Sequence, residues 1–534
     1  MTDSRLGAAS VAPSASAPFD AVTPPPPSPA TTAALGQRLG AAAAVLLAGH
    51  PAGHVDDLLA RGNGVLADAL VRHVQQTKVD SELWLVLVAL TAAFPDVEFF
   101  LGVRRSLGVT APEFALSSVF ETIQQSYRPL KCLDSELEIV TDRPVADVDF
   151  CAKYDHNTGI QRVVRETFSR WIGDHELELA CWSAGDNALR ELSPVERRRV
   201  VDWDAWKQTP PASRPTSTPP GFRPRLVVPY ATTVLLPEVA RDGYWSALSS
   251  LAQFSGNRVG LIGYDTIPIA SADLIAENES EKFAKYLSIV KNADRVAAIS
   301  ASAADEFRGF ARAASAQGIP PATVVSVPLA VQTPTRGTAP ARRAGQGRPA
   351  SKLVLMVGNQ EPRKNNLAVL FAAETLWREG LDFRLRMIGG GSSEYTRFVD
   401  REVKRLARAG HAVELLRGAP DSVLVDSYAE AHCTVFPSTH EGFGLPVAES
   451  LAMGVPSITT DYGSTLEIAE GGGCLTVDPR DDRQLVAALR SMLTEPGVHE
   501  RLVAEAEARP PRDWNDYAAE LWHDLVDPLE RDLR

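Results

Sequence analysis

Length, composition and charge limit the possibilities before any motif is considered. The chain has 534 residues, 45% apolar and 23% charged, which is the balance of a folded protein with roughly two to four domains. Its formal net charge of −13 argues against general nucleic-acid binding, which needs a basic face. The five cysteines lack C-x-x-C spacing, which indicates reduced thiols in a cytoplasmic protein and not disulfides or a zinc site.

The first quarter of the chain contains few strand-like runs. Residues 1–30 are rich in proline and alanine and predict a disordered tail, because they carry too few bulky apolar side chains to pack. Residues 31–135 place apolar side chains at helical spacing and predict a small α-helical domain. Within it the apolar run 83–94 is too short to span a membrane and predicts a buried helix. We expect these helices to bind a protein partner that the sequence does not name.

From residue 136 to residue 332, short β-type runs alternate with helical stretches. This alternation predicts a parallel sheet covered by helices, in a Rossmann-like domain. The proline-rich stretch 209–223 predicts an exposed loop. The strand-like runs are 147–151, 226–230, 259–264 and 296–300, and the helical stretches are 158–171 and 282–291.

Residues 333–350, rich in proline and arginine, predict a linker, after which the alternation begins again. Residues 351–510 predict a second Rossmann-like domain, and residues 511–534 a C-terminal helix that crosses back to the first domain. The fold class is therefore α/β, with two tandem domains facing a central cleft. In such domains, ligands bind beyond the carboxyl ends of the strands. The predicted strands are 353–357, 383–388, 413–416, 434–436 and 457–460, and the helices are 366–379, 397–409 and 446–453.

The segment "HEGFGLPVAE" (440–449) joins a predicted strand to a predicted helix. Gly442 and Gly444 allow the backbone to approach a ligand, and Pro446 suits the first turn of the helix. The free N–H groups of that turn favour an anion. Glu441 precedes the turn, and Glu449 is placed to reach sugar or ribose hydroxyls. The alternative is a plain strand–turn–helix with glutamates facing solvent.

The segment "GNQEPRKN" (358–365) lies where the first strand of the second domain gives way to its first helix. Arg363 and Lys364 can neutralise a diphosphate, the first through a planar fork and the second as a point charge. The alternative is a solvated basic pair. Cations at a helix N-terminus oppose the helix dipole, however, and a bound anion would remove that conflict.

Together with "PSTHEGFGLPVAESLAMGVPSITTD", this segment resembles the C-terminal domain of family 4 glycosyltransferases. The resemblance covers residues from about 147 onward and is most specific at 353–480. It implies the GT-B fold and a retaining, metal-independent transferase that needs no cofactor beyond its nucleotide-sugar co-substrate. In that fold the domain at 136–332 would be the acceptor side of the site, and the domain at 351–510 would bind the nucleotide-sugar donor. Arg363 and Lys364 would bind the donor diphosphate, Glu441 the donor sugar, and Glu449 the ribose.

The resemblance also implies roles for residues outside these carboxylates and cations. The "HNTGIQRVVRE" segment resembles a phosphate-approaching loop, and "GYDTIP" resembles an H-D-x-x-P segment in which Asp265 is kept and Tyr264 stands where histidine is common. Asn359 follows the strand glycine where the family often has arginine. The residues expected to approach the donor or its phosphates are Gly159, Arg162, Gly358, Gly389, Gly442, Phe443, Gly444 and Leu445.

Two weaker patterns resemble other kinds of binding site. Gly389-Gly390-Gly391 lacks the complete G-x-G-x-x-G spacing of a dinucleotide site, so we interpret it as a tight turn near the base. Asp147-Val148-Asp149 and Asp202-Trp203-Asp204 match the metal-binding D-x-D pattern of another fold. We place Asp147 at the start of a strand, away from the cleft, and expect no metal.

These inferences predict a cytoplasmic hexosyltransferase that acts in surface polysaccharide or glycoconjugate assembly. The donor we expect is GDP-mannose or a related deoxysugar nucleotide. The acceptor is a glycan or a lipid-linked sugar, which in the second case requires a peripheral contact with the inner face of the plasma membrane. Two alternatives remain open, a GT-B sugar-nucleotide epimerase and a non-catalytic scaffold of the same fold.

Overall fold

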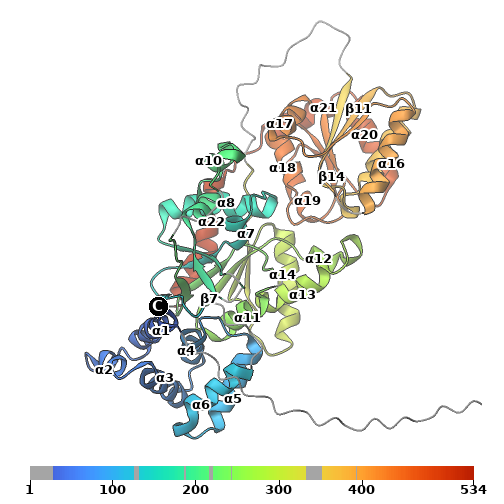
Figure 1. Ribbon diagram of the computed structural model, residues 1–534. Helices are drawn as coiled ribbons and strands as arrows, with labels where there is room; N and C mark the ends of the chain where they lie inside the picture. The colour runs from blue at the N-terminus through green and yellow to red at the C-terminus, as the bar shows by residue number, and fades with distance from the viewer. Residues whose placement is uncertain are drawn as a thin grey trace, which may run out of the picture.

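The computed structural model describes residues 28–125, 132–183, 185, 188–215, 221–241, 243–331, 351–391 and 394–533. These residues form a helical segment, a first α/β domain and a second α/β domain, stacked in that order along the long axis of the molecule (Figure 1). The predicted linker at 333–350 and nearly all of the predicted tail at 1–30 lie outside the described residues. Helix α1 begins at Pro29, inside the predicted tail.

The helical segment packs around a helix that is apolar on all sides, as the sequence predicts for residues 83–94. Every residue from Leu83 to Thr91 is buried, which is typical of a helix enclosed by its neighbours. The helices are α1 (Pro29–Leu46), α2 (His54–Ala60), α3 (Asn63–Thr77), α4 (Asp80–Thr91), α5 (Val97–Val109) and α6 (Ala115–Gln125).

The helical segment shares one apolar core with the first sheet. A single buried cluster runs from Leu39 and Trp84 in the helices to Val228 and Leu251 in the first α/β domain. The buried Arg38 reinforces this junction, because its guanidinium donates to the carbonyl oxygens of Ala89, Leu133 and Ser135 at 2.7–2.9 Å. The helices therefore cover the sheet as part of the same folded unit.

The first sheet has the order β1-β5-β4-β3-β2-β6-β7-β8-β9 in the described residues, and its pairs are parallel except those of β4. Strand order reverses between β2 and β6, which places a crevice at their carboxyl ends. The strands are β1 (Leu137–Val140), β2 (Val145–Asp147), β3 (Glu178–Trp182), β4 (Leu189–Glu191), β5 (Leu226–Pro229), β6 (Thr233–Leu236), β7 (Arg258–Gly263), β8 (Arg295–Ala298) and β9 (Thr323–Ser326).

Strands β5, β6 and β7 are buried along almost their whole length, as expected for parallel strands covered on both faces. The predicted strand at 147–151 is wrong, because β2 ends at Asp147 and the apolar run continues as helix α7. The covering helices are α7 (Asp149–Lys153), α8 (Gly159–Asp174), α9 (Pro194–Val201), α10 (Trp203–Gln208), α11 (Trp245–Phe254), α12 (Ile267–Ala270), α13 (Glu279–Val290) and α14 (Ala301–Ser315).

The second sheet is entirely parallel, with the order β12-β11-β10-β13-β14-β15. Counted from β10, this is the Rossmann order, and its switch point lies between β10 and β13. The strands predicted in this domain are confirmed. They are β10 (Lys352–Val357), β11 (Phe383–Ile388), β12 (Val413–Leu416), β13 (Cys433–Phe436) and β14 (Ser457–Thr460), and a further strand that was not predicted is β15 (Cys474–Val477).

The helices of the second domain follow the same alternation. Those predicted near 366–379, 397–409 and 446–453 are present as α15, α16 and α18. The set comprises α15 (Asn366–Arg378), α16 (Glu394–Arg408), α17 (Asp421–Glu430), α18 (Leu445–Ala452), α19 (Gly463–Ala469), α20 (Asp482–Thr494) and α21 (Val498–Glu507). The α/β, GT-B arrangement predicted from the sequence is confirmed by the two facing domains.

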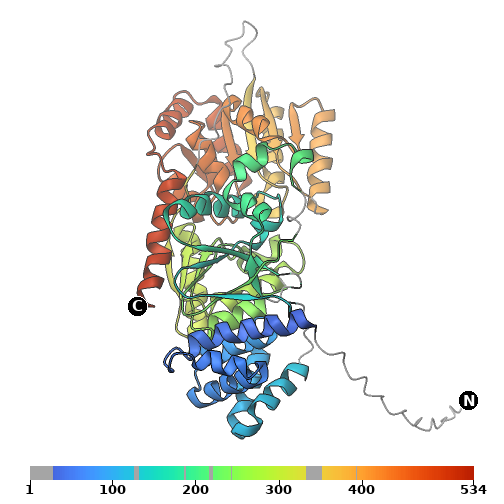
Figure 2. The same cartoon turned by 60° about the vertical axis from the view of Figure 1, so that its left-hand side comes forward.

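After α21 the chain returns to the first domain and runs along its side (Figure 2). This return consists of α22 (Trp514–Leu521), η5 (Trp522–Val526) and α23 (Asp527–Arg531), which pack on α8, β7 and β8. Trp171 donates its indole N–H to the carbonyl oxygen of Ala518 at 2.9 Å. A Cβ on Gly260 would lie 2.7 Å from Leu529, so β7 can take only glycine there without a shift.

The two segments that connect the domains touch each other. The N–H of Val331, at the end of the first domain, donates to the carbonyl oxygen of Arg512 at 3.2 Å. The Arg512 guanidinium in turn donates to the carbonyl oxygen of Pro328 at 2.9 Å. The outgoing and returning chains are therefore tied together at the junction of the domains.

We expect Leu525→Ala to lower the free energy of unfolding by roughly 2–5 kcal/mol, because it leaves a cavity between the returning helices and the first sheet. Leu525 is 1% exposed in that core. Urea denaturation followed by fluorescence measures the change. The matched control is His523→Ala, whose side chain is 74% exposed and should change stability by less than about 0.5 kcal/mol. Equal effects of the two variants would contradict the packing described for this segment.

Candidate active site

The switch point of the second sheet brings together two cations and one carboxylate. Arg363 and Lys364 lie in the 3₁₀ turn η4 (Pro362–Lys364) after β10, and Glu441 lies after β13. Arg363 Nη1 is 3.0 Å from Glu441 Oε2, and Lys364 Nζ pairs with the other oxygen of that carboxylate. All three side chains are less than a fifth exposed. The structure therefore places these three predicted residues in one buried cluster.

Charge pairing sets the protonation states in this cluster. Burial would raise the pKa of Glu441, but Lys364 and Arg363 outweigh burial and hold that pKa below its ordinary value. Burial lowers the pKa of Lys364, although Glu441 opposes the shift. Arg363 also pairs with Glu361 at 2.9 Å. The two cations are thus held close together in a low-dielectric setting, where electrostatic interactions are strong.

Residues 438–445, which we call the donor-site loop, fix the position of η4. The carbonyl oxygen of Arg363 accepts hydrogen bonds from the N–H of Thr439 at 2.8 Å and from the hydroxyl of Ser438 at 3.0 Å. Ser438 also donates to Glu441 at 2.5 Å. Gly444 has φ of 109°, in the left-handed region that favours glycine, and starts α18. Helix α18 thus begins four residues after Glu441, and the N–H groups of Val447 and Ala448 in its first turn donate to the carbonyl oxygen of Gly444.

The donor-site loop contacts the first domain. A Cβ on Gly442 would lie 2.4 Å from the carbonyl oxygen of Tyr264 and 3.2 Å from the carboxylate of Asp265. Phe443 and Leu445 pack against the apolar cluster of the first domain, and Leu445 lies against Gly159 at the start of α8. Gly159, Asp265, Gly442, Phe443 and Leu445 therefore meet where the two domains face each other.

Asp265 and Tyr264 have different environments although they are adjacent. Asp265 lines a cleft of about 1010 Å³ between the domains, and burial raises its pKa to about 6. Tyr264 is buried in the apolar cluster, where its hydroxyl donates to the carbonyl oxygen of Pro237 at 2.8 Å. Burial holds the pKa of Tyr264 well above its ordinary value. Tyr264 is therefore a packing residue, and Asp265 is the ionisable group at this strand end.

Arg162 of the first domain and Glu449 of the second domain form a second contact between the domains. Arg162 Nη1 lies 2.7 Å from Glu449 Oε1, and the hydroxyl of Tyr428 donates to the other carboxylate oxygen at 3.2 Å. Glu449 is 9% exposed. Arg162 thus joins the first domain to the helix that begins at the donor-site loop.

Gly358 and Gly389 form a third group, at the ends of β10 and β11. A Cβ on Gly389 would lie 1.9 Å from the carbonyl oxygen of Gly358, so the backbones touch. The N–H of Gln360 donates to the carbonyl oxygen of Gly390 at 2.7 Å, which supports the tight turn predicted there. Asn359, Gln360 and Gly391 line the same 1010 Å³ cleft as Asp265 and Arg363.

Sequence reasoning missed four residues that contact the site. Tyr428 holds Glu449, and His440 bonds to Glu306 of the first domain at 2.6 Å. Glu467 accepts hydrogen bonds from the start of α14. His440 lies inside the recognised motif and could have been singled out. The other three carry no local signal, because their partners are distant in the chain.

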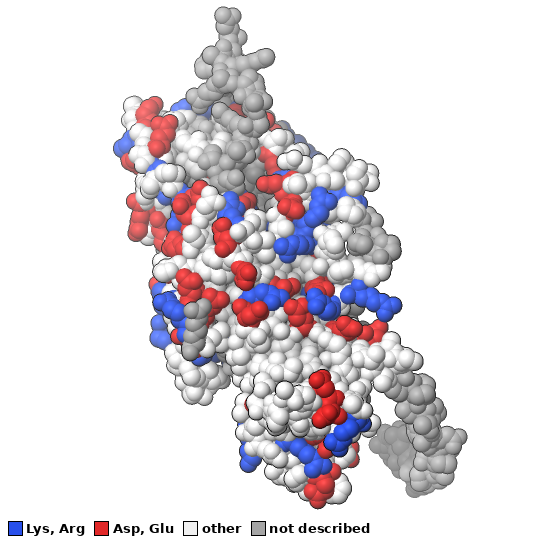
Figure 3. All heavy atoms as spheres, turned by 90° about the vertical axis from the view of Figure 1, so that its left-hand side faces the viewer, with Lys and Arg blue, Asp and Glu red and all other residues white. Residues whose placement is uncertain are grey.

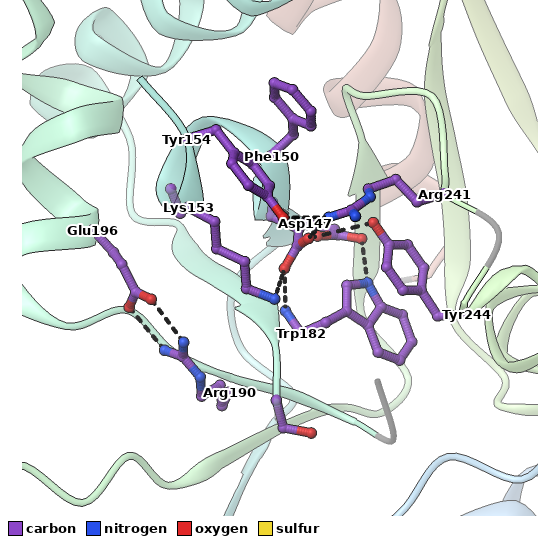
Figure 4. Close-up of polar contacts among 12 residues, drawn as sticks. Asp147, Phe150, Lys153, Tyr154, Trp182, Arg190, Glu196, Arg241 and Tyr244 are labelled. Atoms are coloured by element: carbon purple, nitrogen blue, oxygen red, sulfur yellow. Dashed lines mark hydrogen bonds and ion pairs between the residues drawn. The ribbon is translucent and has the colours of Figure 1, made fainter. Parts of the chain in front are cut away.

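The interpretation of Asp147 needs correction. Asp147 lies at the carboxyl end of β2 and not at a strand start, and it is buried beside Asp149 and Glu238. Figure 4 shows Asp147 next to Trp182. Burial, followed by the charges of Asp149 and Glu238, holds the pKa of Asp147 well above its ordinary value.

Protein groups already satisfy these carboxylates. Trp182 donates its indole N–H to Asp147 at 2.8 Å and its backbone N–H to Asp149 at 2.9 Å. Lys153 pairs with Asp149 at 2.5 Å, and Glu238 accepts from the N–H of Cys151 at 2.9 Å. Across the described ranges, no group of three or more His, Cys, Asp or Glu side chains is arranged to hold a metal ion.

Two further sequence expectations concern nucleic-acid binding and the apolar helix at 83–94. Figure 3 shows basic and acidic side chains interspersed on one face of the described molecule, with no broad basic area of the kind that nucleic acids require. None of the helices in the described residues combines the length and apolar character needed to cross a bilayer.

Comparisons with known proteins find a family match for the second domain. Residues 340–509 match the family model described as glycosyl transferases group 1. The serotype-specific mannosyltransferase WbdA of Escherichia coli is 26% identical over 343 residues, which cover 62% of this chain and 40% of WbdA. A D-inositol 3-phosphate glycosyltransferase of Thermobispora bispora is 33% identical over 200 residues, 36% of this chain and 47% of that protein.

The chain thus spans less than half the length of these curated relatives. Among solved structures, Anabaena HepE in complex with UDP aligns over 72% of this chain and 99% of its own, with 11% identity and a TM-score of 0.48. The family model covers η4, the donor-site loop and α18, the elements that hold the cation cluster. The second α/β domain of this chain is therefore a glycosyl transferases group 1 domain, of the family 4 type that its motifs indicated.

Proposed function

We propose that the chain is a retaining, metal-independent hexosyltransferase that uses a nucleotide-sugar donor. The observation that carries the proposal is the buried cluster of Arg363, Lys364 and Glu441 beside the N-terminus of α18, at the face between the two domains. Mannose from GDP-mannose, or a related deoxysugar, is the hexose we propose, supported by the mannosyltransferase activity named for WbdA. The proposed acceptor is a glycan or lipid-linked sugar in surface polysaccharide or glycoconjugate synthesis.

The proposed reaction is driven by electrostatics. The bond between the sugar C1 and the phosphate oxygen breaks, and its electron pair leaves with the nucleoside diphosphate. Arg363, Lys364 and backbone N–H groups of the donor-site loop stabilise that developing negative charge, because their positions are fixed before the reaction. The acceptor oxygen bonds to C1, and its proton passes to the departing phosphate on the same face. That path retains the anomeric configuration.

The other residues hold the reactants in this arrangement. Glu441 fixes the two cations through both carboxylate oxygens, and Glu449, held by Tyr428 and Arg162, binds the ribose. Gly159, Gly358 and Gly389 let the backbone approach the donor. Asp265 faces the cleft from the first domain, where we propose that it contacts the transferred sugar or the acceptor hydroxyl.

We expect one of GDP, UDP, dTDP and ADP to raise the melting temperature of the wild type but not that of an Arg363→Ala, Lys364→Ala double variant. A ligand at about 100 times its Kd adds roughly 2.7 kcal/mol of stability, and the variant lacks the charges that bind the diphosphate. Thermal-shift measurement with each nucleotide checks this.

The matched control is Arg378→Ala, Arg480→Ala, which removes two cations of the same domain with side chains 72% and 71% exposed. It should retain the nucleotide response. If no nucleotide stabilises the wild type, the donor site is absent and the scaffold interpretation replaces this proposal. Nucleotide-sugar consumption without acceptor would instead favour an epimerase, and product NMR reports whether the anomeric configuration is retained.

We expect kcat/KM to rise as the pH increases through about 6 in the wild type, because burial raises the pKa of Asp265 to about 6 and the ionised carboxylate accepts a stronger, charge-assisted hydrogen bond from a sugar or acceptor hydroxyl. The raised pKa also means that the contribution of this carboxyl to folding stability falls as the pH rises between its unfolded value and about 6. Initial rates at a series of pH values measure the effect.

Asp265→Asn should lower kcat/KM at neutral pH by roughly 100-fold. It should also remove the acidic limb of the profile, which is the fall in kcat/KM below a pH of about 6. Asp273→Asn, a change at an exposed carboxylate of the same loop region, should leave the profile unchanged. An acidic limb that persists in Asp265→Asn would assign the titration to another group.

Turnover should be unchanged, within about twofold, after dialysis against EDTA, because the proposed charge stabilisation comes from Arg363, Lys364 and backbone N–H groups. Rates before and after addition of Mg²⁺ or Mn²⁺ test this. Loss of activity in EDTA that Mn²⁺ restores would overturn the metal-independent mechanism.

A further inference from the structure

The N-terminus of α14 in the first domain is capped by a carboxylate from the second domain. Glu467 of α19 accepts hydrogen bonds from the N–H of Ala301 at 2.9 Å and of Ser302 at 2.6 Å, and also from the Ser302 hydroxyl. These N–H groups have no partner within their own helix, and a negative charge is favourable at a helix N-terminus. The cap is complete only when the two domains meet.

The same helix end holds the donor-site loop. The Ser300 hydroxyl accepts from the N–H of Ala303 at 3.0 Å and donates to the carbonyl oxygen of Gly442 at 2.7 Å. Gly442 is the residue that meets the Tyr264 carbonyl oxygen so closely that a Cβ would not fit. One turn of α14 thus contacts both Glu467 and the residue next to Glu441.

His440, on the other side of Glu441, is held by the first domain as well. Its Nε2 is 2.6 Å from Glu306 of α14, and its Nδ1 is 2.8 Å from the Ser271 hydroxyl after α12. Glu306 is itself fixed by the N–H and the hydroxyl of Thr266, both at 2.7 Å. The loop is therefore anchored to the first domain on both sides of Glu441.

The charges around the imidazole favour its protonated form. Burial would lower the pKa of His440, but Glu306 on α14, Asp265 after β7 and Glu441 in the loop outweigh it, and the pKa is raised. The Arg363 guanidinium lies nearby and donates to the His440 carbonyl oxygen at 3.1 Å. The ion pair with Glu306 is present while His440 carries its proton and is lost as the pH rises through the raised pKa.

We propose that Glu306 and Glu467 are positioning residues that clamp the donor-site loop onto the first domain, so that Glu441 and its two cations are aligned for transfer only in the closed arrangement. The inference rests on the proposed transferase function and names the residues that would couple domain closure to it. Neither carboxylate contacts Arg363 or Lys364 directly in the described residues, so each acts through the loop.

The test uses the full-length chain with Glu467→Gln and Glu306→Gln. An amide lacks the charge that the helix N-terminus and His440 favour, so we expect kcat to fall about tenfold in each variant. Nucleotide affinity should stay within about twofold, because the diphosphate cations lie on the second domain. In Glu467→Gln, hydrogen exchange at the Ala301 and Ser302 amides should be at least about fivefold faster in the presence of the nucleoside diphosphate that stabilises the wild type.

Matched controls are Glu470→Gln and Asp305→Asn, which remove exposed carboxylates from the ends of the same two helices. Both should behave as the wild type. In the wild type, kcat should fall as the pH rises through the raised pKa of His440, because the ion pair with Glu306 is then lost. In Glu306→Gln, this alkaline limb of kcat should move to lower pH, because the carboxylate that raises the pKa of His440 is gone; a merely structural role would not move it.

Unchanged kcat and unchanged amide exchange in Glu467→Gln, or an unshifted alkaline limb in Glu306→Gln, would overturn the proposal while wild-type turnover persists. An inactive wild type that no nucleotide stabilises would instead refute the proposed function. These two failures are therefore distinguishable.

Discussion

The ion cluster of Glu441 with Arg363 and Lys364 is the interaction on which the arrangement of the site depends. Two adjacent cations at the start of a helix repel each other and oppose the helix dipole, so they need a compensating anion to be buried. Glu441 supplies this compensation from the neighbouring strand end. The cluster therefore ties the ends of β10 and β13 together and sets where α18 begins.

The sequence predicted the second domain more accurately than the first. Strand β10 is an almost continuous apolar run that ends at a glycine, β11 has β-type apolar residues at every second position, and the alternation of strands and helices around them is regular. In the first domain the run that starts at Asp147 changes from strand to helix without a break in hydropathy, and Glu238 caps the new helix from 88 residues away. Local patterns do not contain that contact, so the strand was placed too late.

The residues of the candidate site also differ in how far they could be predicted from local sequence. Arg363, Lys364, Glu441 and Glu449 lie within motifs whose chemistry can be argued from neighbouring residues. The partners that hold the loop against the first domain, such as Glu306 and Glu467, are recognisable only once two domains are folded and facing. Tyr264 stands where the family commonly has histidine, and its side chain is part of the core.

The hydrogen bond between Val331 and Arg512 joins the chain that leaves the first domain to the chain that returns to it. Both partners are backbone groups, so the bond does not depend on which side chain stands at either position, except that a proline at 331 would have no N–H to donate. The Arg512 guanidinium adds a second link through the carbonyl oxygen of Pro328, and this link does require arginine. The contact between the two passages therefore tolerates most substitutions at one of its links and few at the other.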